Sequence, residues 1–509
     1  MDWNDEVDVL VAGSGGGLAG AYTAAREGLT VAVVEATDKF GGTTAYSGGG
    51  TWYPCNPRLV RAGVDDTIED ALTYYHAVVG DRTPRELQDT YVLGGRKFVE
   101  YLEKDEHFAF DLWPWPDYYG KAPKSRGDGM RHMLPTPLAA GDVTELRALM
   151  RPPLDTERLG APLPDVLTGG QALIARLLSG ISQYPAVSLH ANSALTELVV
   201  TDGEVVGAII ERPGERVAIR ARRGVLLAAG GFEANDELRA RYGVPGAARD
   251  TMGVPGNLGQ ALEAAIAIGA DTDLLDQAWW SPGVVHPDGR ATFSLWFTGG
   301  IFVGQDGKRF VNESAPYDRL GRDIIARMEQ GKLTLPYWMI YDDREGEVPP
   351  AKATNVSMVE PEKFVAAGLW HTASTLAELA DKIGMPADNL VETVARFNEL
   401  AATGVDTDFG RGDEAYDRMF ADGGSPLVPI ERGPFHAAAF GISDLGTKGG
   451  LRTDTHARVL ATSGAVIPGL YASGNTMAAA SGTAYPGGGN PVGSSMLFSH
   501  LAALNMVDR

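Results

Sequence analysis

Residues 481–493 read SGTAYPGGGNPVG, in which a single tyrosine is followed by a proline and three glycines. An ordinary turn needs one glycine with a positive φ and at most a proline ahead of it, so the run Gly487–Gly489 exceeds what a connection requires. Glycine runs of this kind let backbone N–H groups approach a bound group closely. We therefore expect a binding function at this loop, beside the hydroxyl group of Tyr485.

A second glycine-rich loop lies near the N-terminus, between two apolar segments. Residues 7–12 (VDVLVA) show the continuous, β-branched pattern of a buried parallel strand. The segment GSGGGLAGAYTAAREG has helical spacing up to Gly28, and LTVAVVE is a second expected strand that ends in Glu35. Such a unit holds a pyrophosphate at the helix N-terminus, and its acidic residue accepts a hydrogen bond from a ribose hydroxyl. The sequence therefore predicts a dinucleotide site.

The glycine spacing in this first loop is irregular. A strict G-x-G-x-x-G pattern that starts at Gly13 puts its last glycine at position 18, which is occupied by Leu18. If the register is set from Glu35, Gly17 takes the third role and the loop is one residue short. We expect the loop to contact the phosphates, with the individual contacts left open, through Gly13, Ser14, Gly15, Gly16 and Gly17.

Composition limits the class of protein. A chain of 509 residues with 44% apolar residues is long for one core, so two domains are expected. A net charge of −22 argues against nucleic acid or an anionic membrane as a partner. The single cysteine, Cys55, excludes an intramolecular disulfide and fits a reducing compartment, with the cytoplasm as the expected location. The sequence has neither the roughly 20-residue apolar run of a membrane span nor the pattern of a signal peptide.

Other chemistries lack their residue patterns. The nine histidines show no metal-ligand spacing, so no metal site is predicted. There is no G-x-S-x-G nucleophile elbow, so hydrolysis is not indicated. Aromatic residues gather in two segments, and core packing is the simpler interpretation of each ring alone. Together they are suited to a flat apolar slot for a polycyclic ligand; these rings are Trp113, Trp115, Tyr118 and Tyr119, and Trp279, Trp280, Phe293, Trp296 and Phe297.

The expected elements divide the chain into two domains. A helix at GGQALIARLLSGI is followed by a hairpin with an Asp202–Gly203 turn and by a buried strand in ARRGVLLAAGG. Residues 276–443 are richer in aromatics and include one long helical tract at 375–404. We predict an α/β fold: a nucleotide-binding domain at 1–275 and 444–509, interrupted by an inserted α+β catalytic domain at 276–443. No internal repeat is evident.

Two further segments resemble flavoproteins of the glutathione-reductase-like superfamily, whose FAD-binding domain is Rossmann-like. ATDKFGGTTAYSGGG (36–50) resembles their GG motif, and GLYASGN (469–475) resembles their closing motif. The extended FAD explains two half-sites far apart in sequence better than NAD does, and no second strand–glycine–acid unit is visible for NAD(P)H. The resemblance implies further FAD contacts from Ala36, Gly41, Gly42, Thr43, Thr44, Ser47, Gly48, Gly49, Ala229, Gly230, Gly474, Asn475, Pro491 and Val492.

The mode of flavin attachment is also implied. Succinate dehydrogenase flavoproteins carry a histidine that bonds covalently to the flavin, and no histidine stands in TTAYSGGG. We therefore expect FAD to be held without a covalent bond. For Cys55 we expect a packing role instead of attachment.

The stretch KRFVNESAPYDRLGR resembles the fumarate reductase and succinate dehydrogenase flavoprotein superfamily. Members that act on dicarboxylates place an arginine beside the NES motif. Here Tyr317 stands where a cationic acid catalyst is expected, and Arg319 lies two residues further on. A neutral phenol at this place implies a substrate without carboxylates.

Six motifs together resemble the 3-oxosteroid 1-dehydrogenases (3-ketosteroid delta-1-dehydrogenases) from end to end: NESAPYD, SDLGTKGGL, GLYASGN, SGTAYPGGGNPVG, PDYYG and the N-terminal fingerprint. The resemblance implies that a C1–C2 double bond is introduced into ring A of a 3-oxosteroid, with hydride transfer to FAD. It assigns the polarisation of the C3 carbonyl to the Tyr485 hydroxyl and the Gly489 N–H, and proton abstraction from C2 to Tyr317. Tyr118, or its neighbour Tyr119, assists by stabilising the Tyr317 anion.

Three alternatives remain at this stage. A 3-oxosteroid 4-dehydrogenase shares the FAD domain and the carbonyl polarisation, and a fumarate-reductase-like enzyme runs toward reduction. A flavin protein that only carries electrons or binds a sterol is the non-enzymatic alternative. Because no NAD site is visible, a quinone or another redox protein is the expected electron acceptor.

Overall fold

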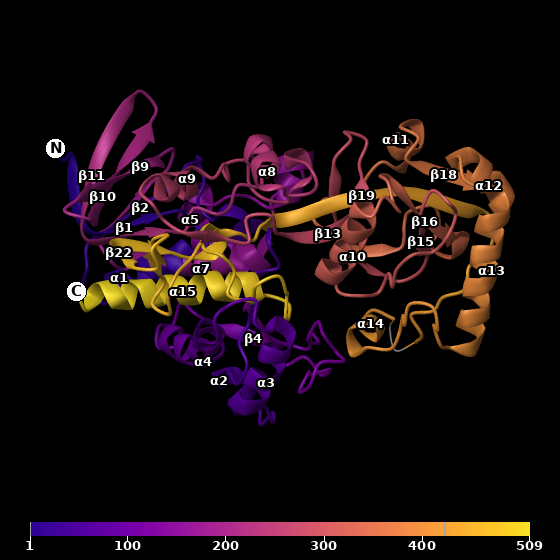
Figure 1. Ribbon diagram of the computed structural model, residues 1–509, viewed down its shortest axis with the longest axis horizontal. Coiled ribbons are helices and arrows are strands. Elements are labelled where there is room, and N and C mark those ends of the chain that lie inside the picture. Colours follow the sequence, from indigo (N-terminus) through magenta and orange to yellow (C-terminus); the bar gives the residue numbers. More distant parts are fainter. Residues whose placement is uncertain (1, 422–423) are drawn as a thin grey trace. The chain divides into compact units, whose positions relative to one another are not determined.

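The computed structural model describes residues 2–421 and 424–509 (Figure 1). Contacts divide the chain into two compact units. Unit 1 contains the chain up to Val244, then Gly253–Ala278 and Gly446–Arg509, and unit 2 contains Pro245–Met252 and Trp279–Leu445. The expected insertion, 276–443, differs from this division by a few residues at each end. Residues 245–252, which were expected in the first domain, pack with unit 2 instead.

The centre of unit 1 is a largely parallel sheet in the order β21-β22-β11-β1-β2-β8. The strand β10 also pairs with β11, and β9 pairs with β10. The strand β1 pairs in parallel with both β2 and β11. Continuous apolar stretches bury these strands on both faces, as the sequence predicts. The strands are β1 (Asp5–Ala12), β2 (Val31–Val34), β8 (Val187–His190), β9 (Ala194–Thr201), β10 (Glu204–Arg212), β11 (Glu215–Leu227), β21 (Arg458–Leu460) and β22 (Val466–Ala472).

The expected hairpin is confirmed. The strands β9 and β10 are antiparallel, and the two residues between them, Asp202 and Gly203, have φ values of 51° and 81°. Two positive φ angles in a two-residue loop are typical of a type I′ turn, which glycine and aspartate tolerate best. The buried strand β11 then returns the chain to the central sheet.

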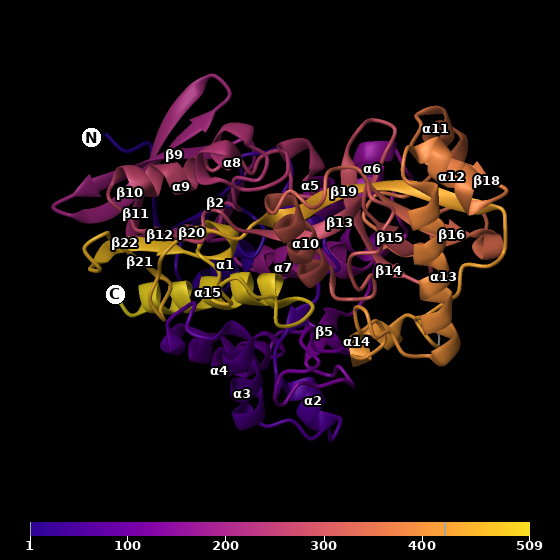
Figure 2. The same cartoon turned by 45° about the vertical axis from the view of Figure 1, so that its right-hand side comes forward.

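Helices pack beside this sheet. The helix α15 (Asn490–Val507) contacts α1 (Gly17–Arg26), which also contacts α7 (Gly169–Ser182) (Figure 2). The other elements of unit 1 are η1 (Gly42–Tyr46), β3 (Thr51–Trp52), α2 (Pro57–Arg61), α3 (Ile68–Val79), α4 (Arg85–Leu102), β4 (Phe110–Trp113), β5 (His132–Pro135), β6 (Leu138–Ala139), η2 (Ala140–Val143), α5 (Thr144–Leu149), α6 (Leu154–Leu159), β7 (Val166–Leu167), α8 (Asp236–Tyr242), α9 (Gln260–Ala267), β12 (Thr272–Asp273), β20 (Gly450–Leu451) and η5 (Gly474–Thr476).

Unit 2 is built on a sheet in the order β15-β16-β19-β13-β14-β17, with β18 paired to β19. The pairs β15–β16, β16–β19, β18–β19, β13–β14 and β14–β17 are antiparallel. Its strands are β13 (Ala278–Val285), β14 (Ala291–Phe297), β15 (Ile301–Val303), β16 (Tyr337–Asp342), β17 (Ala351–Thr354), β18 (Trp370–Ala373) and β19 (Phe435–Thr447). Its helices are η3 (Ala248–Asp250), α10 (Tyr317–Glu329), η4 (Asp343–Glu345), α11 (Pro361–Ala366), α12 (Leu376–Ile383), α13 (Ala387–Thr403) and α14 (Ala415–Met419).

The long helical tract expected at 375–404 is wrong in one respect, because it forms two helices, α12 and α13. Gly384 ends the first helix in the left-handed conformation with φ 70°, and Pro386 precedes the second helix. A left-handed glycine closes a helix, and a proline favours the start of a new one over continuation.

Candidate active site

The N-terminal glycine loop is shaped by close approach to its neighbours. Gly13 follows β1 with φ 100°, and a Cβ atom there would lie 2.1 Å from the carbonyl oxygen of Ala228. The helix α1 begins at Gly17, where a Cβ atom would lie 2.9 Å from the Cβ of Ala228. Gly17 therefore provides the close helix–strand packing that the third glycine of this motif usually supplies.

Glu35 links three segments of the predicted cofactor site. The hydroxyl of Ser14 donates to Glu35 Oε2 at 2.6 Å, and the amide of Thr37 donates to Glu35 Oε1 at 2.9 Å. Ser14 Oγ also accepts from the Gly41 amide at 2.8 Å. The glycine loop, the buried acid after β2 and the start of the GG segment are thus fixed to one another.

The two predicted half-sites meet within unit 1, although they lie far apart in sequence. A Cβ atom on Gly16 would lie 2.0 Å from Ser495 Oγ, and one on Gly474 would lie 2.7 Å from the same atom. A Cβ atom on Gly15 would lie 3.0 Å from Thr44 Oγ1 in η1. Glycines from both ends of the chain therefore pack directly against Ser495 and Thr44, where a side chain would have little or no room. A glycine loop at a helix N-terminus with a buried acid beside it fits a pyrophosphate and a ribose.

The remaining predicted cofactor residues surround the same segments. Thr43 Oγ1 accepts from Asn257 Nδ2 at 3.1 Å, and Gly230 accepts at its carbonyl from Thr476 Oγ1 at 2.8 Å. Ser47 donates to the carbonyl of Thr44 at 2.8 Å. The others follow from their segments: Ala36 after Glu35, Gly42 at the start of η1, Gly48 and Gly49 before β3, Ala229 after β11, Asn475 in η5, and Pro491 and Val492 in the first turn of α15.

Two of the predicted catalytic tyrosines are in contact. The rings of Tyr118 and Tyr485 meet edge to face with centroids 5.1 Å apart, and the exposed fractions of the residues are 1% and 4%. The Tyr118 amide donates to the carbonyl of Pro486 at 3.0 Å. Tyr119 is half-buried, and its amide donates to the hydroxyl of Tyr74 at 3.3 Å. Of the two adjacent tyrosines, it is the ring of Tyr118 that packs on Tyr485.

The three glycines after Pro486 approach their neighbours closely, most of all Gly487 and Gly489. A Cβ atom on Gly487 would lie 2.3 Å from Trp52 Cδ1, and one on Gly488 would lie 3.2 Å from the Tyr118 hydroxyl. Gly489 has φ 89°, and its Cβ would lie 2.4 Å from the carbonyl carbon of Gly50. Gly489 also caps the N-terminus of α15. The glycine run thus brings the backbone against Trp52, Tyr118 and β3 instead of only turning the chain.

Several residues that support this loop were not found from the sequence. Lys448 is fully buried, and its Nζ donates to the carbonyls of Thr483 and Ala484 at 3.1 Å each. The hydroxyl of Tyr74 donates to the carbonyl of Pro486. A lysine inside the glycine-rich segment GTKGGL is an unusual pattern and was the available signal for Lys448.

A buried ion pair lies directly beside Tyr118. Asp117 accepts from Trp52 Nε1 at 2.8 Å and from Arg131 Nη1 at 2.7 Å. Burial raises the pKa of Asp117 to about 6, against the opposing effect of the Arg131 charge. The neighbouring His132 is neutral, because burial lowers its pKa to about 3. The polar side chains that lie beside Tyr118 are therefore buried and largely desolvated.

Tyr317 belongs to unit 2, whereas Tyr118, Tyr485 and Gly489 belong to unit 1. It is the first residue of α10, is 7% exposed, and meets the ring of Phe293 edge to face at 4.9 Å. Tyr317 also lines a pocket with Trp296, Tyr416 and Phe420. Trp296 has φ 62°, a left-handed conformation that is strained for a bulky residue and that occurs at functional sites.

The aromatic residues singled out from the sequence fall into both units. Trp279, Trp280, Phe293 and Phe297 are buried in unit 2. In unit 1, Trp113 is 39% exposed. Core packing therefore describes the first group well, and a shared slot stays a prediction.

Comparison with known proteins places the chain in a family. The FAD binding domain family matches residues 8–492. The 3-oxosteroid 1-dehydrogenase of Mycobacterium tuberculosis (strain ATCC 25618 / H37Rv) is 37% identical over 99% of each chain. The chain belongs to the 3-oxosteroid 1-dehydrogenase family. The resemblance predicted from the motifs is thereby confirmed, and FAD is the cofactor.

Solved structures agree with this assignment. The crystal structure of 3-ketosteroid delta1-dehydrogenase from Sterolibacterium denitrificans, in complex with 1,4-androstadiene-3,17-dione, has a TM-score of 0.90 and 30% identity and covers 99% of this chain and 100% of its own. The 3-ketosteroid-delta4-(5alpha)-dehydrogenase of Rhodococcus jostii RHA1 has a TM-score of 0.67 and 25% identity, covering 100% of this chain and 98% of its own. The alternative of a 4-dehydrogenase is therefore not favoured.

Neither a membrane-spanning helix nor a metal-binding cluster occurs in the described part of the chain. No helix in residues 2–421 and 424–509 is long and apolar enough to cross a membrane. No group of three or more histidine, cysteine, aspartate or glutamate side chains in those residues is arranged to hold a metal ion.

Proposed function

We propose that the chain catalyses the FAD-dependent 1,2-dehydrogenation of 3-oxosteroids in steroid catabolism. The observation that carries this proposal is the buried contact of Tyr118 with Tyr485 on a glycine-lined loop. A phenol and a backbone amide are the donors that the polarisation of a ketone needs. Full-length family membership supports the steroid as the substrate class.

The first task of the site is to acidify the C2 hydrogen of ring A. The hydroxyl of Tyr485 and the N–H of Gly489 donate to the C3 carbonyl oxygen and stabilise the enolate as it develops. Since an added Cβ atom at Gly489 would lie 2.4 Å from the carbonyl carbon of Gly50, only a glycine lets the backbone that carries this N–H take its position. Lys448 supports this arrangement by holding the two carbonyls that precede Tyr485.

Tyr317 takes the proton from C2, and Tyr118 is assigned the supporting role in this step. The Tyr317 position carries no cationic side chain, which suits a neutral ketone better than a carboxylate. When bound, FAD supplies the acceptor for the hydride that leaves C1. Loss of one proton and one hydride accounts for the two hydrogens removed as the C1–C2 double bond forms.

We propose that unit 1 is a Rossmann-like, glutathione-reductase-like FAD-binding domain and that unit 2 is the inserted α+β catalytic domain. The strand–glycine loop–helix–strand–acid order of β1, α1 and β2 supports this assignment. In this proposal FAD is held without a covalent bond. Cys55 is a poor attachment point, because burial raises its pKa to about 12 and its thiol contacts the carbonyl of Asp66 at 3.2 Å.

For the re-oxidation step we propose a quinone or another redox protein as the electron acceptor. Within the described residues, one strand–glycine–acid unit, built from β1, α1 and β2, carries the nucleotide pattern. A cytoplasmic location remains our expectation from the single cysteine.

Product identification tests the proposal. The FAD-loaded enzyme is mixed with 5α-androstane-3,17-dione and an artificial electron acceptor, and the product is identified by NMR. A 1-ene product supports the proposal, and a 4-ene product overturns it in favour of 4-dehydrogenation. Anaerobic mixing with androst-4-ene-3,17-dione is the second measurement, because bleaching of the flavin absorbance separates a dehydrogenase from a protein that only binds sterols.

A further inference from the structure

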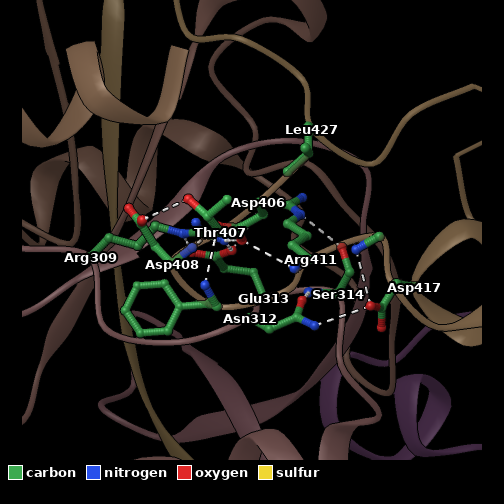
Figure 3. A network of polar contacts seen from close by, with 12 residues as sticks. Arg309, Asn312, Glu313, Ser314, Asp406, Thr407, Asp408, Arg411, Asp417 and Leu427 are labelled. Atoms are coloured by element: carbon green, nitrogen blue, oxygen red, sulfur yellow. Dashed lines mark hydrogen bonds and ion pairs between the residues drawn. The ribbon is translucent and has the colours of Figure 1, made fainter. Parts of the chain in front are cut away.

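A cluster of charged side chains is buried in unit 2, and its central residue, Glu313, lies four residues before Tyr317 in the sequence (Figure 3). The side chains of Arg309, Glu313, Asp406 and Arg411 are at most 5% exposed. Two guanidinium groups face two carboxylates, so their charges balance. Buried ion pairs are costly to desolvate, and apolar residues of similar size often replace them without loss of stability. Stability alone is therefore a weak explanation for this cluster.

Glu313 is the centre of the cluster. Its Oε1 accepts from Arg309 Nε at 2.9 Å and from the Phe302 amide at 3.0 Å. Its Oε2 accepts from Arg309 Nη2 at 2.8 Å and from Arg411 Nη1 at 3.1 Å. Four donors from three residues thus fix one carboxylate, and with it the chain at this residue.

The residues on either side of Glu313 also form hydrogen bonds to the segment 406–417. Ser314 Oγ accepts from Arg411 Nε at 2.9 Å, and Arg411 Nη1 also donates to the carbonyl of Gly300 at 2.7 Å. Asn312 Nδ2 donates to Asp417 Oδ2 at 3.2 Å. Three consecutive side chains, 312 to 314, are therefore bonded to the segment 406–417 (Figure 3).

Little freedom remains between this anchor and Tyr317. The Ala315 amide donates to the carbonyl of Asn312 at 3.2 Å, and Pro316 is the residue that precedes α10. Proline fixes its own φ, so the short connection through Ala315 and Pro316 couples the position of Ser314 to that of Tyr317, the first residue of the helix. The phenol of Tyr317 is placed by the cluster as well as by its contact with Phe293.

We propose that Arg411 and Glu313 are positioning residues for the proton abstraction by Tyr317. This inference rests on the proposed function, in which Tyr317 takes the C2 proton of the steroid. A displacement of about 1 Å in a reacting group costs on the order of 100-fold in rate. Because neither residue is assigned a steroid contact, loosening the anchor lowers kcat and leaves KM nearly unchanged.

The principal test is Arg411→Lys, which keeps the positive charge beside Glu313 but loses the planar fork that reaches both Ser314 and Gly300. We expect kcat for a 3-oxosteroid to fall about 10- to 100-fold, with KM within about threefold of the wild type. We also expect a larger deuterium isotope effect for substrate labelled at C2, because proton abstraction becomes more strongly rate-limiting.

A matched control is available in the same unit. Arg344 forms a two-point ion pair with Asp342 at 3.0 Å and donates to the carbonyl of Pro429 at 2.6 Å, and both partners lie outside residues 312–317. Arg344→Lys is expected to lower the melting temperature without changing kcat or the C2 isotope effect. FAD content and steroid affinity, measured by flavin absorbance, are expected to stay at the wild-type level in both variants.

A milder pair of variants keeps the test decisive if Arg411→Lys does not fold. Ser314→Ala removes only the acceptor of Arg411 Nε and is expected to shift kcat and the isotope effect in the same direction, whereas Ser314→Thr retains the hydroxyl and is expected to recover both. Wild-type kcat and isotope effect in Arg411→Lys or Ser314→Ala, with only the melting temperature lowered, would overturn the positioning role. Failure of the wild type to oxidise any 3-oxosteroid would instead overturn the proposed function on which it rests.

Discussion

The rings of Tyr118 and Tyr485 pack edge to face with their planes at 64°, although one follows β4 and the other precedes α15. Both rings are buried, and the Tyr118 amide is bonded to the carbonyl of Pro486. The packing therefore depends on rings and backbone. Because phenylalanine keeps the ring, the hydroxyl groups can be removed one at a time without dismantling the loop.

We predict that Tyr485→Phe retains FAD and the melting temperature but loses about 100- to 1000-fold in kcat. This is the usual consequence of removing one donor to a developing oxyanion. Steady-state kinetics with androst-4-ene-3,17-dione measures the loss, and flavin absorbance measures the cofactor. If Tyr485→Phe turns over at the wild-type rate, the Tyr485 hydroxyl does not polarise the carbonyl.

For Tyr317→Phe we expect FAD and steroid binding to persist while most of the turnover disappears, since a positioned general base contributes on the order of 100- to 10,000-fold. The edge-to-face contact with Phe293 needs only the ring and is preserved. Steroid titration followed by flavin absorbance, together with single-turnover kinetics, separates binding from proton abstraction. Near-normal single-turnover rates would assign the base to another group.

Gly489→Ala is expected to lower both activity and stability, because φ is 89° and the new Cβ would lie 2.4 Å from backbone of Gly50. Gly464→Ala is the matched control: its φ is 83°, and no atom lies within 4 Å of the added Cβ. The Gly464→Ala variant carries only the cost of placing an alanine at a positive φ, which is about 1 kcal/mol. Thermal melting and kcat of the two variants separate that cost from the close approach of the Gly489 backbone. Equal behaviour of the two would contradict a special role for this approach.

Glu35→Gln tests the cofactor site by affinity instead of by activity. The substitution keeps the shape of the side chain but removes the charge that accepts from Ser14 and Thr37. Since hydrogen bonds to charged groups contribute about 1.5–3 kcal/mol, we predict that FAD binds about 10- to 100-fold more weakly to the apoprotein. Fluorescence titration of the apoprotein with FAD provides the dissociation constant. An unchanged constant would argue against a ribose contact by Glu35.

The strands, the glycine loop and the FAD family were predictable because each has a local signature. The run VDVLVA, the glycines up to Gly17 and the acid at Glu35 follow one another within a single strand–helix–strand unit. The break at Gly384 was equally local, but the helical periodicity on both sides obscured it. Pattern and turn chemistry of this kind act between near neighbours in the chain.

The supporting residues were not predictable, because their partners are distant in sequence. Lys448 binds carbonyls at 483 and 484, and Arg411 binds Ser314 and Gly300 across the chain. Nothing in the residues around Arg411 indicates a buried anion at Glu313. Such contacts follow from tertiary packing, which brings the groups together only after the elements have formed.

His132 gives the protein a defined pH dependence. Burial lowers its pKa to about 3, below the value of about 6.5 in an unfolded chain, so the unfolded state binds more protons between these two values. The stability that His132 contributes is therefore present above about pH 6.5 and is lost as the pH falls toward 3. In going from pH 7 to pH 5, this loss is about 2 kcal/mol.

We predict that His132→Gln flattens the decline in the free energy of unfolding over this range, whereas substitution of the exposed His456 by glutamine leaves the decline unchanged. Urea denaturation at pH 5, 6 and 7 measures the slopes. Parallel pH profiles for His132→Gln and the wild type would show that the imidazole of His132 becomes protonated in the folded protein.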